Sequence, residues 1–309
     1  MPQQANTQAS GSRLTHALRE LRWLLLSPPL LDTTPGAWPE AVQGFSANEA
    51  ADIDHWLQME ALNPDRLTRF LSDADAAQGP TARLGRHAER LLAYGLRHGP
   101  THRAVAAHIV LRNPLPQPDR STLGEIDFLV EDALGARWQW ELAVKFYLCS
   151  ARGQVASVHD FVGPDRSETF AAKLHKMFAQ QLRHRPPPPW DAQAWQPAAF
   201  TRGWLFYRHG EPLPKVDGLH PQHLRGRWLQ RARVHELAGV AWHHLPRAQW
   251  LAPLSPDAKS ADAGADIAAW LPTLDALLPR AQMLVRCADG VETERVFVVP
   301  DDWPALTLS

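Results

Sequence analysis

Cysteine is nearly absent from this sequence. The chain of 309 residues contains two cysteines, Cys149 and Cys287, and neither stands in a CxxC or a mixed Cys/His spacing. Zinc ribbons, zinc fingers and disulfide frameworks depend on such spacings, so these classes of protein are excluded. Two isolated thiols are the usage expected in the reducing cytoplasm.

Long apolar runs are absent as well. No segment offers the roughly 18 uncharged apolar residues that a membrane-spanning helix needs. The N-terminus also lacks the basic region and apolar core of a secretory signal. We therefore expect a cytoplasmic protein that has no membrane partner.

An excess of charge of either sign is missing too. Lysine and arginine number 32 against 33 acidic residues, and the formal net charge is −1. No global field attracts a polyanion, so any nucleic-acid site must be local. Lysine itself is rare, with five residues against 27 arginines, so each lysine marks a departure from the default cation of this chain.

What is present is a succession of helical and strand-like periods. Apolar residues recur at helical spacing in four segments: 13–26, 48–71, 81–98 and 167–183. Alternating or continuous apolar runs predict strands in four others: 103–111, 125–130, 137–148 and 203–207. Residues 283–299 contain an Asp-Gly pair in the middle and predict a hairpin. Within the segment 167–183, Ser167 is the expected helix N-cap.

These elements predict an α/β protein. The length allows one large domain or two ordinary ones. The expected organisation is a helical N-terminal segment over 1–80, a core over 81–210, and an α+β extension over 211–309 packed on that core.

The strands 125–130 and 137–148 carry the residues with chemical potential. Asp127 lies in the first strand, and Glu141 and Lys145 share one face of the second, because side chains alternate along a strand. Charges inside an apolar run are costly unless they are paired or bind a ligand. Two carboxylates can bind Mg²⁺, and a lysine can stabilise the charge that develops during phosphodiester hydrolysis.

These residues, on a helix, three strands, a helix and a strand, resemble the PD-(D/E)XK nuclease superfamily, the restriction-endonuclease-like fold, over about 81–210. The resemblance implies Mg²⁺-dependent hydrolysis of nucleic acid, with Mn²⁺ as a possible replacement and DNA favoured over RNA. Asp127 and Glu141 would be the metal ligands. Lys145 would be the electrostatic catalyst.

A narrower resemblance covers nearly the whole chain. It rests on these segments: Leu84-Gly85-Arg86, Glu89-Arg90-Leu91, Gly124-Glu125-Ile126-Asp127, Glu141 to Phe146, Gly203 to Tyr207, Trp250 to Pro253 and Pro300 to Pro304. They look like the bacterial domain of unknown function 1853. That family brings no activity with it.

The superfamily resemblance implies further site residues. Glu89, on the first core helix, corresponds to a glutamate that many members place near the metal. On the later helix, Lys173, Lys176 and Gln180 lie on one stripe, and the equivalent helix of related nucleases directs basic or glutamine side chains toward the site. We therefore expect Glu89 to assist catalysis and the other three to contact nucleic acid.

One departure from the motif leaves two functions open. The acid of the motif is normally two positions before the lysine, but Ala143 stands there, and Glu141 lies roughly 13 Å from Lys145 at Cα in a regular strand. The first hypothesis is a metal-dependent nuclease. The second is a catalytically inactive nuclease-like fold that binds nucleic acid or protein, with Lys145 in a structural salt bridge to Asp127 or Glu141.

Overall fold

The computed structural model describes residues 16–79, 83–112, 122–254, 264–289 and 291–304. The chain forms two compact units. The first comprises Met1–Val144 and Leu174–Arg202, and the second comprises Lys145–Lys173 and Gly203–Ser309. Each unit is described below by itself.

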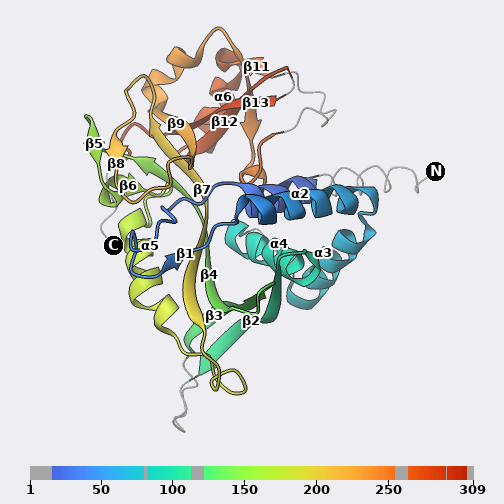
Figure 1. The fold of residues 1–309 in the computed structure, drawn as a ribbon. Coiled ribbons are helices and arrows are strands. Elements are labelled where there is room, and N and C mark those ends of the chain that lie inside the picture. Colours follow the sequence, from blue (N-terminus) through green and yellow to red (C-terminus); the bar gives the residue numbers. More distant parts are fainter. Residues whose placement is uncertain (1–15, 80–82, 113–121, 255–263, 290, 305–309) are drawn as a thin grey trace, which may run out of the picture. The chain divides into compact units, whose positions relative to one another are not determined.

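Helices of the first unit precede its sheet in the sequence. They are the helix over 16–26, α2 (Ala47–Leu62), α3 (Asp65–Gln78) and α4 (Leu84–His98). Helix α2 begins at a capping box in which Ser46 and Glu49 satisfy each other's backbone amides. Helix α3 packs on α4, and α4 packs on strand β2 (Figure 1).

A buried arginine ends the helix over 16–26. The guanidinium of Arg202 donates to the carbonyl oxygens of Leu24 at 2.9 Å and Leu25 at 3.4 Å. Helix ends leave such carbonyls without intrahelical partners. The two prolines that follow would stop the helix in any case, but Arg202 satisfies the acceptors they leave.

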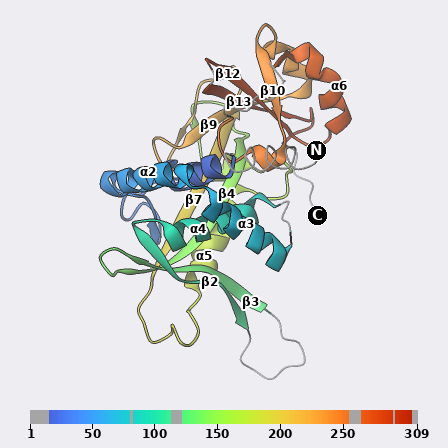
Figure 2. The ribbon, with the colours of Figure 1, turned by 90° about the vertical axis from the view of Figure 1, so that its right-hand side faces the viewer.

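Three antiparallel strands form the sheet of the first unit: β2 (His102–Arg112), β3 (Thr122–Asp132) and β4 (Arg137–Cys149), of which the first unit includes the part up to Val144. Figure 2 shows β2 and β3 as a long two-stranded ribbon. Within this unit, β1 (Ala41–Val42) also pairs in parallel with β7 (Gln196–Arg208). The unit therefore contains both kinds of strand pairing.

The second unit contains strands of mixed direction. Its strands include the last residues of β7, β9 (Leu224–Gln230), β10 (Ala241–Leu245), β12 (Gln282–Ala288) and β13 (Val291–Val299). Strand β9 pairs in parallel with both β7 and β13, and β12 is antiparallel to β13 and β10. Helix α6 (Ile267–Leu277) contributes Leu274 to a core with Trp242 and Val296.

Short elements complete the described chain. They are β5 (Val155–Ala156), β6 (Phe161–Val162), β8 (Lys215–Val216), β11 (Ala265–Asp266), η1 (Val158–Asp160), η2 (Gln181–Arg183), η3 (Arg231–Leu237) and η4 (Arg247–Gln249). Strand β5 pairs with β8, β6 with β4, and β11 with β10. No helix among the described residues could cross a membrane.

The α/β class is confirmed, because both units combine helices with strands of mixed direction. The strands expected at 103–111, 125–130 and 137–148 are present and slightly longer, and β12 with β13 confirms the C-terminal hairpin. The segment 48–71 forms two helices, separated at Asn63-Pro64. Residues 13–15 and 81–82, expected to be helical, lie outside the described residues, and the three-part division of the chain stays a prediction.

The helix expected over 167–183 is shorter. Helix α5 spans Phe170–Ala179, and its cap is Thr169, whose hydroxyl accepts from the amide of Ala172 at 3.2 Å. The N-cap prediction for Ser167 was wrong, because its amide and hydroxyl both donate to the carboxylate of Asp165 at 3.1 and 2.7 Å. These bonds close a turn before the helix begins.

Candidate functional site

Asp127 marks the place where β3 and β4 cease to pair. The ladder between them runs from Glu131 opposite Arg137 to Phe128 opposite Trp140. At the next position Oδ2 of Asp127 accepts a hydrogen bond from the amide of Leu142 at 2.9 Å. The half-buried side chain therefore does for β4 what a backbone carbonyl does elsewhere in the sheet.

Glu141 follows Trp140, the residue of β4 at the end of the ladder with β3. A ladder longer by one residue would place Glu141 opposite Asp127, and opposed residues direct their side chains to the same face. Glu141 is 3% exposed, and its Oε1 accepts from the side-chain amide of Gln181.

Gln181 is a site residue that sequence reasoning missed. Its carbonyl oxygen accepts from the side-chain amide of Gln139 at 3.4 Å, and its own amide reaches Glu141. Gln139 and Glu141 are two residues apart on β4, so both present the same face to η2. No sequence signal links a glutamine at 181 to a glutamate forty positions earlier.

Lys145 belongs to the second unit and has a carboxylate partner there. Its Nζ lies 2.6 Å from Oε2 of Glu168, and the hydroxyl of Tyr147 donates to the same oxygen at 2.8 Å. Burial alone would raise the pKa of Glu168, but the two hydrogen bonds and the charges of Lys145 and Lys173 hold it below its ordinary value. Burial, with Glu168 nearby, raises the pKa of Tyr147.

A glycine lets β7 approach the backbone of Lys145. Gly203 has φ +146°, and a Cβ added there would lie 1.8 Å from the carbonyl oxygen of Lys145. Any other side chain would clash with backbone atoms that cannot rotate away. The glycine at the start of the segment 203–207 is therefore required by the close approach of two strands.

The remaining predicted residues differ in exposure. Glu89 is half-buried on α4, next to Arg90, which pairs with Asp75 at 2.6 Å. Lys173 is buried at 9% exposure, whereas Lys176 and Gln180 are exposed. The stripe expected on the later helix is thus not one uniform surface. The positive charge of Lys173 helps to lower the pKa of Glu168.

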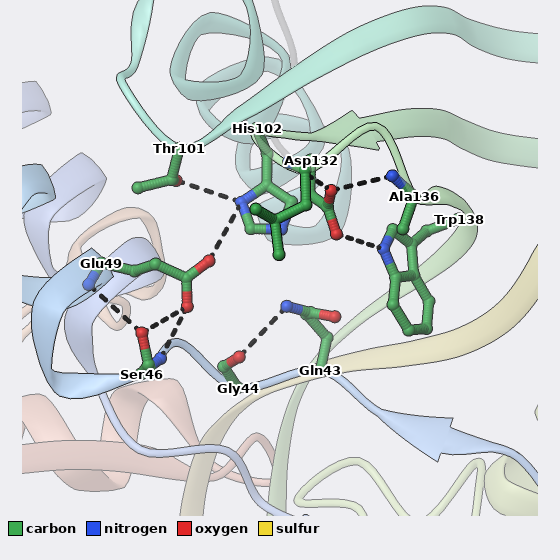
Figure 3. A network of polar contacts seen from close by, with 10 residues as sticks. Gln43, Gly44, Ser46, Glu49, Thr101, His102, Asp132, Ala136 and Trp138 are labelled. Carbon is green, nitrogen blue, oxygen red and sulfur yellow. Dashed lines mark hydrogen bonds and ion pairs between the residues drawn. The ribbon is translucent and has the colours of Figure 1, made fainter.

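A second polar network lies in the first unit, at the other end of β2 and β3 (Figure 3). The imidazole of His102 lies between Glu49, 3.9 Å from its Nδ1, and Asp132. Asp132 accepts from the amides of Leu134 and Ala136 and from the indole of Trp138. These three hydrogen bonds of Asp132 close the β3–β4 turn, so this network has a structural role.

The donor types of Asp127 and Glu141 fit Mg²⁺. This ion is commonly held by one or two carboxylates and completes its shell with water and substrate oxygens. Across the described residues, no group of three or more His, Cys, Asp or Glu side chains is arranged to hold a metal ion. A metal at Asp127 and Glu141 would therefore depend on water or phosphate for most of its ligands.

Comparison with protein families matches residues 19–299 to a domain of unknown function (DUF1853). No curated protein and no solved structure matches the chain.

Proposed function

The chain belongs to the DUF1853 family, and from this premise we propose that it is a cytoplasmic, Mg²⁺-dependent nuclease of the PD-(D/E)XK type. Its substrate would be nucleic acid, DNA before RNA. Asp127 and Glu141 would bind the metal, and Lys145 would stabilise the charge on the reacting phosphate. Glu89 would assist near the metal, and Lys173, Lys176 and Gln180 would contact the substrate.

The observation that carries the proposal is the position of Asp127 at the end of the β3–β4 ladder. The half-buried Asp127 and the buried Glu141 each follow directly on the last pair of that ladder, and both come from strands. Sites on strands hold their ligands more accurately than sites on loops. The element order α4, β2, β3, β4, α5, β7 gives further support, since it follows the order that the resemblance implies.

Each residue has a definite chemical task. Bound Mg²⁺ would polarise a phosphate oxygen and lower the pKa of a water ligand. Asp127 and Glu141 supply the negative charge that attracts the ion. Lys145 is a compact cation with three N–H donors and suits a phosphate oxygen as a point charge. The backbone bond from Leu142 fixes the carboxylate of Asp127 in one orientation.

A binding module without catalysis is the second candidate. It is favoured by Ala143, which stands where the motif has its acid, and by the ion pair of Lys145 with Glu168. In that case the fold would bind nucleic acid or protein, and the carboxylates would be structural.

Isosteric variants separate the two candidates. Asp127→Asn and Glu141→Gln remove charge but keep an acceptor for Leu142 and a partner for Gln181, whereas Asp127→Ala also removes the bond to Leu142. Titration calorimetry with Mg²⁺ or Mn²⁺ should show binding by the wild type and none by the two isosteres. Cleavage of single-stranded, duplex and branched DNA, and of RNA, should stop in both isosteres and in Lys145→Met.

Glu125→Gln is the matched control, since Glu125 lies two residues from Asp127 on β3 and contacts His108 at 3.2 Å. It should retain both metal binding and cleavage. A wild type that binds neither divalent ion and cleaves none of these substrates would refute the nuclease and leave the binding module. In either case Asp127→Ala should lower the free energy of unfolding by about 1–3 kcal/mol relative to Asp127→Asn, because a buried amide loses its acceptor.

A further inference from the structure

Glu168 receives two hydrogen bonds on a single oxygen. Nζ of Lys145 and the hydroxyl of Tyr147 lie 2.6 and 2.8 Å from its Oε2. Lys145 and Tyr147 are two residues apart on β4, so they present the same face of the strand. The carboxylate of Glu168 therefore contacts two residues of β4, Lys145 and Tyr147, from a separate segment of the chain.

The backbone around Glu168 is held firmly. The carbonyl oxygen of Glu168 accepts from the amide of Gly163 at 2.8 Å, and Thr169 bridges to Val162. Thr169 also caps α5. Glu168 is thus fixed between a strand pairing and a helix start, which limits the positions its carboxylate can reach.

Tyr147 is held as firmly on the other side. It is 1% exposed, and its ring stacks on Phe170 with centroids 4.9 Å apart. Its hydroxyl therefore offers Glu168 a donor in a fixed place. The side chain of Lys145, by contrast, is long and flexible. The carboxylate of Glu168, which Tyr147 orients, holds its ammonium in one place.

Stability alone explains this ion pair poorly. The side chains of Lys145 and Glu168 are 30% and 33% exposed, and pairs at such exposure add little to folding. Arginine, the default cation here, would bind a carboxylate through two parallel bonds. Lysine instead gives one N–H to Glu168 and keeps two for another acceptor.

We propose that Glu168 is a positioning residue that fixes the ammonium of Lys145 for the reaction. This inference rests on the proposed nuclease function. Asp165, three residues earlier in the same turn, provides a matched comparison, because its Oδ1 binds Ser167 instead.

The first test needs no activity. The full chain is treated with an amine-specific acetylating reagent, and the rate at each lysine is followed by peptide mass spectrometry, which five lysines make simple to resolve. Glu168→Gln should raise the rate at Lys145 several-fold, while exposed Lys176 and Lys215 react as in the wild type. Tyr147→Phe should produce a smaller rise, and Asp165→Asn none. Melting temperatures confirm that each variant is folded.

The second test uses the nuclease reaction. Glu168→Gln should lower kcat about 10- to 100-fold and leave KM unchanged, because a displaced catalytic group weakens the transition state more than substrate binding. The loss of activity below pH 4.5 should also change, because the pKa of Glu168 lies below that ordinary value and the variant has no carboxylate there to protonate. Asp165→Asn should keep the wild-type kcat, KM and pH profile.

The two hypotheses fail separately. An unchanged acetylation rate at Lys145 in folded Glu168→Gln overturns the positioning role, whatever the nuclease assay shows. An altered rate together with a wild type that cleaves no nucleic acid supports the hold of Glu168 on Lys145 and refutes the nuclease. A changed rate with unchanged kcat in Glu168→Gln would also overturn the positioning role.

Discussion

At the scale of single residues, the buried His223 makes the second unit sensitive to acid. His223 donates from Nδ1 to the carbonyl oxygen of His220 at 2.7 Å, and its Nε2 lies 2.7 Å from the hydroxyl of Tyr207. A neutral imidazole that donates at Nδ1 and accepts at Nε2 satisfies both contacts. Burial lowers the pKa of His223 to about 4, although the bond to His220 acts in the opposite direction.

The sign of the pH dependence follows from that shift. The unfolded imidazole has a pKa of 6.5, so the unfolded state takes up the proton first as pH falls. The contribution is fully present above pH 6.5 and is lost progressively toward about pH 4, by about 3 kcal/mol over that window. The free energy of unfolding, measured with denaturant, should change much less between these pH values in His223→Gln than in the wild type. His175→Gln, an exposed control on α5, should follow the wild type, and equal slopes in all three proteins would contradict the assignment.

The candidate site shows what residue-level reasoning can find. Asp127, Glu141 and Lys145 stand out in the sequence because charge inside an apolar strand is costly without a partner. Glu168 and Gln181 do not stand out, because each is an ordinary polar residue near a helix. Their contacts with β4 arise from chain segments 23 and 40 positions away.

At the scale of elements, the pairing of β4 and β7 near Lys145 depends on Gly203. Gly203→Ala should cost several kcal/mol of unfolding free energy, since its Cβ would overlap a backbone carbonyl at 1.8 Å. Gly239→Ala is the control: it also has positive φ, +85°, but nothing lies within 4 Å of the added carbon. It should cost about 1–2 kcal/mol from backbone strain alone. Similar losses in both variants, measured by denaturant unfolding, would show that the close approach is not the cause.

The elements also show where periodicity stops being informative. Strand positions follow from alternation, because the buried face of each strand reads directly as apolar residues. The start of α5 does not, because Ser167 and Thr169 are both acceptable caps in isolation. Thr169 becomes the cap because it forms a β-bridge with Val162, and because the hydroxyl of Ser167 already donates to Asp165.

At the scale of the whole molecule, the balanced charge limits any electrostatic attraction to nucleic acid. Several arginines are already paired with acids: Arg166 with Asp302, Arg183 with Glu40, Arg231 with Asp275 and Arg233 with Glu236. A chain of net charge −1, with several of its arginines already paired with acids, has few cations to displace counterions from DNA.

The affinity for duplex DNA should therefore depend only weakly on salt concentration. For Asp127→Asn, which cannot cleave under the proposed mechanism, fluorescence anisotropy should give a Kd weaker than about 10⁻⁶ M near physiological salt. The plot of log K against log salt should have a slope shallower than about −5. A slope near −10, as expected of a strongly basic surface, would contradict this prediction.

The sequence by itself determined the α/β class, most strands, the family and the charged residues of the strand pair, because local periodicity and the cost of buried charge are readable along the chain. Only the tertiary structure decided that Asp127 binds the amide of Leu142, that Glu141 contacts Gln181 and that Lys145 pairs with Glu168. Those contacts join segments whose separation in sequence says nothing of their distance in space. They depend on strand register and on the close approach at Gly203.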